Sequence, residues 1–235
     1  MKIIGTFIIS ALLIINISLT VQSQIIVPGS ETLLDKLRLN KGVTGLKSAL
    51  YDDIAGNPYI FKDFQKGKLI VNSGEEFDVN LRYDIFASEM HLKDKDEIYA
   101  IIHPEKVKLI EADSLKFIYS GYTKSPGEET PKEGSYFIVN TDGRCKLLVK
   151  KNIRIQDAEP PKLYQDAKPA KFILTDDTYY LKLEDKSAVR IRNKKELLSV
   201  LGDQKEALSS FISSNKLGIK DVEDMVRIVS YYNGL

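Results

Sequence analysis

Hydrophobic and polar residues alternate strictly in the middle of the chain. From Phe77 to Ile85 every odd-numbered position is apolar or aromatic, and every even-numbered position carries Asp, Asn or Arg. A period of two is typical of a β-strand that has one face on a core and the other in water. The pattern therefore predicts a half-buried strand over these residues.

Short apolar runs of the same kind lie on both sides of this segment and are separated by turn residues. Asp142–Gly143 is the clearest turn, because Asp-Gly between apolar runs is the strongest short-range hairpin signal. Asp176–Asp177 is a second expected turn, and residues 121–134 are expected to form a loop. The other expected strands are 66–71, 90–93, 97–102, 106–110, 115–120, 136–140, 145–150, 171–174, 178–184 and 188–192.

Strands this close together, with no helical pattern between them, favour antiparallel hairpins over parallel α/β units. The predicted fold class is α+β, mainly antiparallel β, with a long meander of hairpins followed by a short helical C-terminal segment. So many strands would curl or split if they formed one open sheet. A bent sheet, a sandwich and a partly closed barrel all satisfy this pattern.

After Arg192 the spacing of apolar residues changes to about 3.6, which indicates helices. Asn193, Asp203 and Asp221 each stand where a helix N-cap is expected, and an apolar stripe follows each of them. The stripes are narrow and flanked by charge. We therefore expect them to pack on one another or on the sheet rather than to dock a partner.

The chain divides into segments of distinct character. They are a signal peptide (1–23), an N-terminal arm or helix (24–55), an antiparallel β region (56–157), a Pro-rich strap (158–170), and a β-hairpin with two or three helices (171–235). Proline has no backbone N–H, so the Pro-rich strap is expected to interrupt the sheet. It either separates two domains or crosses one, and a single fold is favoured because little chain follows it.

The first segment has the order of a secretory signal peptide. Lys2 precedes an apolar run that ends near Leu19, and small or β-branched residues follow at the cleavage positions. We expect cleavage between Ser23 and Gln24. An uncleaved anchor is the alternative, although the run is short and interrupted by polar residues. No later stretch is apolar enough to span a membrane, so we expect an exported protein that is periplasmic, outer-membrane-associated or extracellular.

Composition and charge exclude several functional classes. The chain of 235 residues carries 34 Lys and Arg against 33 Asp and Glu, and it lacks the positive field that nucleic-acid binding requires. One Cys and two His exclude a disulfide framework and leave little for a histidine metal site. The single Cys145 lies in a strand pattern, so we expect it to be buried and inert.

No catalytic motif is found in the sequence. It contains no Gly-rich phosphate loop, no Cys-x-x-Cys, no His-Glu-x-x-His and no Gly-x-Ser-x-Gly. His91 and His103 are expected to be exposed structural residues. We assign no catalytic residue, no metal ligand and no cofactor. A catalytic pair of carboxylates that meet only in the folded chain is the alternative.

Two polar groups are candidates for ligand binding. Arg82 and Asp84 share the polar face of strand 77–85, where cross-strand ion pairing is the alternative interpretation. Arg190 and Arg192, which precede two lysines, form the densest basic group. That group suits an anionic glycan or lipid headgroup, whereas a charged strand edge that prevents aggregation is the alternative.

Five short segments of the sequence stand in a characteristic order and spacing. They are Gly56–Tyr59, Leu81–Asp84, Ala158–Lys162, Asp166–Ala170 and Tyr231–Leu235. In these segments the chain resembles a family of exported β-rich proteins of Gram-negative bacteria that has no known activity. The resemblance covers most of the mature chain. It implies an envelope location and a helical tail, and it implies no catalytic residues.

Taken together, these features predict a non-catalytic exported envelope protein that acts as a binding or assembly component. Its expected partner is an envelope protein or an anionic glycan or lipid, and not a nucleic acid. One alternative is a secreted hydrolase whose carboxylates meet only in the fold. The other is a small-ligand carrier, which would need a closed barrel with an apolar cavity.

Overall fold

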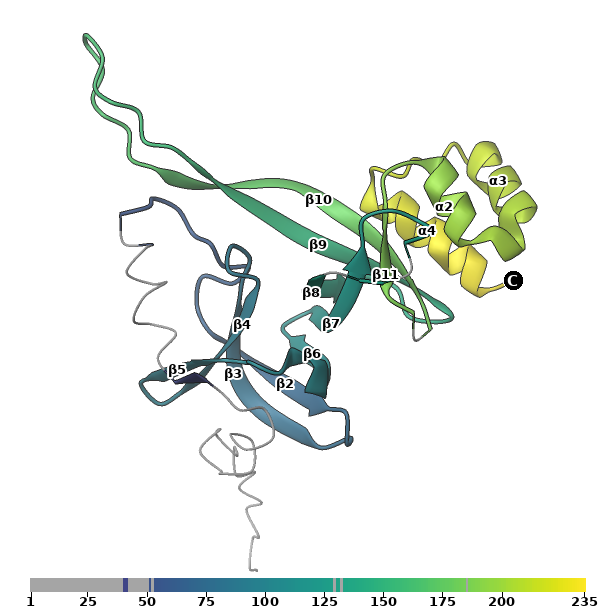
Figure 1. The fold of residues 1–235 in the computed structure, drawn as a ribbon, viewed down its shortest axis with the longest axis horizontal. Helices are drawn as coiled ribbons and strands as arrows, with labels where there is room; N and C mark the ends of the chain where they lie inside the picture. The colour runs from purple at the N-terminus through teal and green to yellow at the C-terminus, as the bar shows by residue number, and fades with distance from the viewer. Residues whose placement is uncertain (1–39, 42–50, 52, 129, 132, 185) are drawn as a thin grey trace, which may run out of the picture.

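Eleven strands form one hydrogen-bonded ladder in the described part of the chain, and the last five close into a barrel (Figure 1). The computed structural model describes residues 40–41, 51, 53–128, 130–131, 133–184 and 186–235. The expected signal peptide, with its cleavage site at Ser23 and Gln24, and most of the N-terminal arm lie outside these residues. The strands are β1 (Asn40–Lys41), β2 (Gln65–Val71), β3 (Glu76–Asp84), β4 (Glu89–Asp94), β5 (Glu97–Ala100), β6 (Val107–Ala112), β7 (Leu115–Thr123), β8 (Glu133–Val139), β9 (Cys145–Gln156), β10 (Lys171–Leu183) and β11 (Ala188–Ile191).

Strand β7 closes the barrel, because it pairs with β8 on one side and with β11 on the other. Neighbouring strands in a meander alternate in direction, so an odd number of them must close with a parallel pair. The β11–β7 pair is indeed parallel, and the other barrel pairs are antiparallel. The predicted fold class is confirmed, and the barrel is one of the architectures that the sequence left open.

Aromatic side chains fill the interior of the barrel. Each barrel strand contributes one residue to this buried cluster, which consists of Tyr122, Phe137, Leu148, Tyr180 and Ala188. The rings of Phe137 and Tyr180 pack edge to face with centroids 4.8 Å apart, and Tyr122 packs on both. This interior is packed in the way that small barrels usually are.

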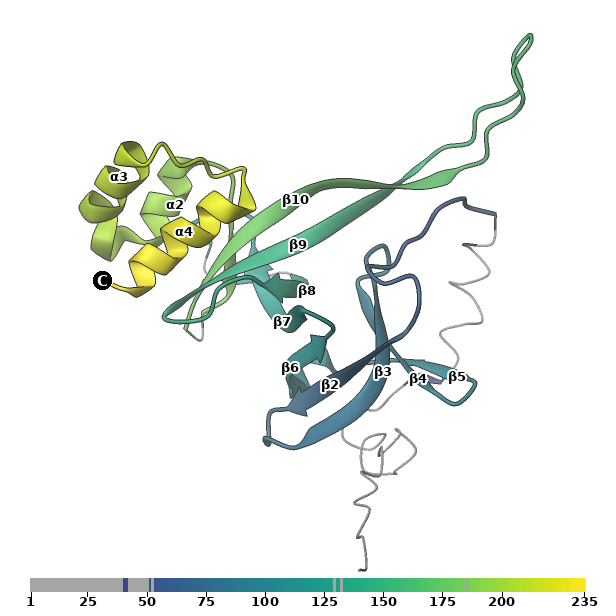
Figure 2. The same ribbon diagram turned by 180° about the vertical axis from the view of Figure 1, so that it is seen from behind.

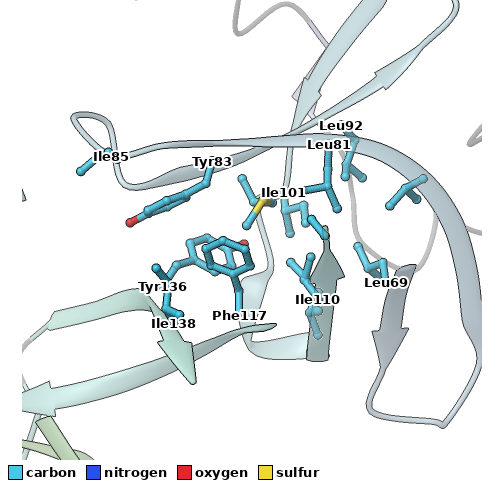
Figure 3. Packing of buried hydrophobic residues seen from close by; sticks show 14 of the residues in the cluster. Leu69, Leu81, Tyr83, Ile85, Leu92, Ile101, Ile110, Phe117, Tyr136 and Ile138 are labelled. Atoms are coloured by element: carbon cyan, nitrogen blue, oxygen red, sulfur yellow. The ribbon is translucent and has the colours of Figure 1, made fainter. Parts of the chain in front are cut away.

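The earlier strands extend the sheet away from β7 in the order β6, β2, β3, β4, β5 and β1. The odd-numbered positions of β3 point into a core, as the alternation predicts, and Leu81 and Tyr83 are fully buried there. The Tyr83 ring meets Phe117 of β7 and Tyr136 of β8, with centroids 5.8 and 5.7 Å away (Figure 3). Strands β7 and β8 therefore contribute side chains to this core as well as to the barrel.

Three helices cover the outside of the barrel: α2 (Lys194–Val200), α3 (Lys205–Ser214) and α4 (Val222–Asn233). Two short 3-10 turns, η1 (Pro104–Lys106) and η2 (Gly202–Gln204), are the other helical elements of the described residues. The apolar stripes of the three helices pack with Cys145, Leu147 and Leu181 of the barrel, so core packing is confirmed. Figure 2 shows the helices gathered at one end of the molecule.

Two of the three predicted helix caps are confirmed. Asn193 accepts a hydrogen bond from the Glu196 amide at 2.9 Å, and Asp221 accepts one from the Asp224 amide at 3.0 Å. The third prediction is wrong, because Asp203 lies within η2 and α3 begins only at Lys205. The Asp203 carboxylate instead accepts a hydrogen bond from the Tyr232 hydroxyl at 3.1 Å, which ties η2 to α4.

Strand β10 is one long strand where the sequence pattern predicted two. The expected turn at Asp176–Asp177 is a bulge, since the register with β9 shifts between Thr175 and Thr178. The Asn152 amide of β9 donates to the Asp176 carbonyl oxygen at 2.8 Å and to the Thr178 hydroxyl at 2.9 Å. Polar groups that favour a turn locally are thus satisfied by the neighbouring strand.

The expected loop at residues 121–134 is shorter than predicted. Strand β7 continues to Thr123 and β8 begins at Glu133, so both ends of the predicted loop belong to the ladder. Gly121 pairs directly with Gly134. Glycine is uncommon inside strands, which is why sequence alone favours a loop here.

Candidate functional site

A long two-stranded hairpin projects from the barrel. Strands β9 and β10 pair with each other along most of their length. Strand β8 pairs with β9 only at Leu148 and Val149, and β11 pairs with β10 only from Tyr179 to Leu181. Figures 1 and 2 show the outer half of this hairpin reaching away from the body, with its end far from the helices. We call residues 152–175 the arm.

The Pro-rich segment forms the outer end of the arm. Two isolated backbone bridges, Glu159–Lys168 and Lys162–Gln165, hold residues 157–170 together as a narrow hairpin. The prolines lack the N–H groups that a continuous ladder would need, as the sequence suggested. The strap expected across the body is therefore a free hairpin end, because the bridges bring the segment back along itself.

Two large apolar side chains stand at the tip of the arm. Leu163 and Tyr164 occupy the centre of the turn between Lys162 and Gln165, and they are 85% and 97% exposed. The backbone of Tyr164 has a φ of +64°, in the left-handed region that favours glycine. A side chain in that region costs about 1–2 kcal/mol. The tip thus presents a large side chain at a backbone conformation that glycine would adopt more easily.

The charges around the tip largely balance one another. The Glu159 carboxylate lies 3.1 Å from the Lys168 ammonium and 3.8 Å from the Lys162 ammonium. Asp166 adds a second acidic group on the same segment. The exposed apolar pair is therefore the distinctive chemical feature of the tip.

The base of the arm is fixed to the first part of the sheet. Phe172 is buried, and its ring packs edge to face with Tyr51 at 5.3 Å and with Phe86 at 5.4 Å. The backbone of Ala55 accepts a hydrogen bond from the Phe172 amide at 2.9 Å and donates one to the Ala170 carbonyl oxygen at 2.8 Å. These contacts set the direction in which the arm leaves the body.

The structure places the candidate Asp84 inside the protein rather than on a polar surface. It is 1% exposed, and its two carboxylate oxygens accept hydrogen bonds from the Ala87 amide at 2.8 Å and from the Tyr51 hydroxyl at 3.1 Å. Burial raises the pKa of Asp84 above its ordinary value, partly offset by the Ala87 hydrogen bond. Both oxygens are engaged in holding a turn and a neighbouring segment.

The candidate Arg82 packs beside Asp84 on the same strand face. Its guanidinium lies 3.7 Å from the centre of the Tyr59 ring and donates to the Tyr59 hydroxyl at 3.1 Å. His91, the cross-strand neighbour of Arg82, is buried. The prediction of an exposed His91 is wrong because the segment around Tyr59 covers this face of the sheet. Burial lowers the pKa of His91, so the neutral imidazole is favoured.

The basic group at the end of β11 is divided between two places. Arg190 and Arg192 line a groove of about 430 Å³ at one end of the barrel, together with Thr178 and Lys220. Lys194 is instead part of α2 and donates to the Ser213 hydroxyl at 3.1 Å. The fold therefore does not bring all of the basic residues of the sequence cluster together.

Other reactive groups offer little chemistry in the described part of the chain. Cys145 is buried as predicted, and burial raises the pKa of its thiol to about 12. His103 contacts the Glu105 carboxylate at 2.9 Å on the surface. The described residues contain no group of three His, Cys, Asp or Glu side chains that could hold a metal ion. Among those same residues no helix is long and apolar enough to cross a membrane.

Comparison with known proteins gives no match. No family model matches the chain. Searches of curated proteins and of solved structures also find no match.

Sequence reasoning missed the residues at the tip of the arm. Leu163 and Tyr164 are an isolated apolar pair between Pro-Pro-Lys and Gln-Asp, and this is the only signal that the sequence offers for them. An apolar pair between polar turn residues is also consistent with a small core contact. The exposure of the pair follows from the three-dimensional position of the surrounding segment, which the sequence alone does not give.

Proposed function

We propose that this protein is a non-catalytic binding component of the cell envelope that docks a partner protein through the tip of its arm. The observation that carries this proposal is the exposure of Leu163 and Tyr164 at the end of an anchored hairpin. The envelope location rests on the signal-peptide pattern of residues 1–23.

The tip residues contribute nothing to the core of their own chain, since both are almost fully exposed. Burying a large apolar side chain against a partner stabilises a complex by about 1.5–3 kcal/mol. Tyrosine is also enriched among the residues that dominate binding energies at interfaces. Leu163 and Tyr164 thus fit the role of an anchor that fills a socket on another protein.

A protein socket suits the tip better than a membrane surface does. Anionic membranes attract segments with surplus positive charge. Between residues 159 and 168 the acidic Glu159 and Asp166 match the basic Lys162 and Lys168, so such a surplus is missing. Balanced charges around an apolar centre are the usual arrangement of a protein interface, with its polar rim.

The two alternative functions have weaker support. For a hydrolase, Asp84 is an unsuitable catalytic carboxylate, because both of its oxygens are bonded to Tyr51 and Ala87. A carrier would need space inside the barrel, which the rings of Phe137 and Tyr180 help to fill.

The double substitution Leu163→Ser with Tyr164→Ser tests the proposal. The native protein is isolated from gently solubilised envelopes, and its co-purifying proteins are identified by mass. We expect the double substitution to reduce recovery of the partner at least tenfold, because two buried side chains are lost from the interface. The melting temperature should not fall, because the replaced side chains make no core contact.

A matched control replaces two exposed apolar residues elsewhere on the surface by serine. Ile102 and Leu235 are 49% and 52% exposed and are not part of the arm, so Ile102→Ser with Leu235→Ser should leave partner recovery unchanged. Recovery of the native protein only as a free monomer would contradict the proposal. Equal recovery of the partner by the native protein and the tip variant would contradict it too.

A further inference from the structure

A ring of polar residues lies at one end of the barrel, one level outward from the aromatic interior. Leu148, Tyr180 and Ala188 point into the barrel from β9, β10 and β11. Side chains two positions apart share a strand face. The residues that continue the inner face toward this end are Lys150, Thr178 and Arg190, joined by Lys124, which directly follows β7, and by Glu133 of β8.

The pairing of strands supports this placement. Lys150 is the direct cross-strand partner of Thr178, and Arg190 is the partner of Tyr180, the interior residue next along the same face. The Lys150 ammonium lies 5.0 Å from the centre of the Tyr122 ring, which is itself part of the interior cluster. Lys150 therefore leans inward over the barrel.

Positive charge exceeds negative charge in this ring. Glu133 is the one acidic member, and it is already engaged by the Lys124 ammonium at 3.3 Å and by the Tyr122 hydroxyl. Lys150 and Arg190 have no carboxylate within ion-pair distance among the described residues. Burial and the repulsion of Arg190 and Lys124 lower the pKa of Lys150, only partly offset by Glu133.

Arg190 also has an unused donor. Its Nε atom is buried and has no hydrogen-bond partner in the described structure. A buried donor without a partner is costly, and a bound acceptor would satisfy it. Thr178 adds a hydroxyl that accepts a hydrogen bond from Asn152 at 2.9 Å, which leaves its own hydrogen available to a ligand.

We propose that the ring binds a phosphate-type oxyanion between the Lys150 ammonium and the Arg190 guanidinium. The planar guanidinium donates in a fork that matches two oxygens of such a group, while the ammonium supplies a compact charge. The anion would relieve the repulsion between the two cations. This site is separate from the tip of the arm and does not depend on the docking function.

The neighbouring groove indicates what the phosphate is attached to. Arg190 and Thr178 line the groove of about 430 Å³, and so do Asp176 and Asp177 of the β10 bulge. Asp177 is paired with Lys151 at 2.7 Å, whereas Asp176 is exposed. The acidic groups disfavour a polymer with many negative charges. The groove instead suits one phosphate group on a neutral polar body, such as a phosphorylated sugar.

Titration calorimetry on the full-length mature protein tests the site. The probes are inorganic phosphate, glucose 1-phosphate with glucose as its uncharged counterpart, and phosphatidylcholine vesicles with or without phosphatidic acid. We expect saturable binding of phosphate and tighter binding of glucose 1-phosphate, with none of glucose. The vesicle titrations distinguish a lipid phosphate from a free or glycan phosphate, since only a lipid ligand would require the bilayer.

Substitutions at the two cations show whether the anion occupies this ring. Lys150→Gln and Arg190→Gln should each weaken phosphate binding about tenfold or more, because each removes a charge-assisted hydrogen bond. Lys151→Gln is the matched control, since the adjacent side chain lies on the opposite strand face and pairs with Asp177. It should bind phosphate as the native protein does.

A second readout keeps the proposal testable if a glutamine variant fails to fold. Bound phosphate should raise the pKa of the Lys150 ammonium in the native protein. NMR of the Lys150 side chain measures this pKa. An unchanged Lys150 pKa at saturating phosphate would overturn the proposal. So would phosphate affinity that is the same in the native protein and in folded Lys150→Gln, or no saturable binding by the native protein.

Discussion

At the scale of single residues, one asparagine joins the C-terminal helix to the barrel. The Asn233 side chain accepts a hydrogen bond from the Cys145 amide at 2.8 Å. It donates to the carbonyl oxygens of Cys145 at 2.9 Å and of Asp142 at 3.1 Å. The end of α4 thereby satisfies the backbone of β9 where that strand begins. Residues about ninety positions apart are tied together by one amide.

Asn233→Ala should lower the free energy of unfolding by about 2 kcal/mol, because it leaves partly buried backbone groups without partners. Urea denaturation followed by circular dichroism measures this change. Ser210→Ala on the exposed side of α3 is the control and should stay within about 0.5 kcal/mol of the native protein. Equal unfolding midpoints for both variants would show that the Asn233 contacts are unimportant.

A buried carboxyl makes stability depend on pH. Burial raises the pKa of Asp84 above that of an unfolded aspartate, which is about 3.9. Between these two pKa values the unfolded chain is ionised while the folded chain still holds the proton. The favourable contribution of the protonated form is therefore present below about pH 4 and is lost as pH rises through the folded pKa.

Asp84→Asn should remove this dependence, because an amide does not ionise. We expect the native protein to lose stability relative to Asp84→Asn as pH rises from about 4, and the difference to level off above the folded pKa of Asp84. Denaturation curves at a series of pH values give this difference directly. A difference that does not vary with pH would show that Asp84 titrates alike in the folded and unfolded chains.

At the scale of elements, a close approach of two strands links the first part of the sheet to the barrel. A Cβ atom on Gly67 of β2 would overlap the carbonyl oxygen of Glu111 on β6. Backbone cannot move aside as the end of a flexible side chain can. Glycine at this position is therefore what allows β2 and β6 to pair.

Gly67→Ala should destabilise the protein by about 3 kcal/mol, the upper part of the range for overpacked interiors. Thermal unfolding measures the loss. Gly202→Ala is the control, because no atom lies within 4 Å of a Cβ built there and its φ is not positive. That variant should be unchanged or slightly more stable. The account of the β2–β6 approach fails if both alanine variants melt at the same temperature.

The elements also show how far local sequence patterns reach. The alternation in residues 77–85 predicts β3 correctly, and the caps at Asn193 and Asp221 are where the sequence places them. These features depend on residues close together in the chain. The bulge at Asp176–Asp177 could not be predicted, because its polar groups are satisfied by Asn152 on another strand.

The candidate sites were harder to predict than the strands for the same reason. His91 follows the polar period of its strand, yet it is buried because the segment around Tyr59 covers it. The sequence identifies Arg190 as a basic residue, but its nearness to Lys150 arises because β10 pairs with β9 on one side and with β11 on the other. Local composition says nothing of which strands become neighbours.

At the scale of the whole molecule, the barrel serves as a base from which the arm projects. Helices α2, α3 and α4 cover the barrel at one end, and the tip of the arm lies toward the other (Figure 1). The contacts of Phe172 with Tyr51 and Phe86 fix the direction of the arm. An isolated two-stranded hairpin is only marginally stable in water. The body therefore supplies the support that allows the tip to be presented at a distance.

The most direct test of this account is photo-crosslinking from the tip of the arm in intact cells. Tyr164 is replaced by a photoreactive phenylalanine analogue, and Ile102, another exposed apolar position, carries the same group in a control. Docking by the arm predicts one protein adduct of defined mass from position 164 and none of that mass from position 102. No adduct from position 164, or the same adduct from both positions, would contradict it.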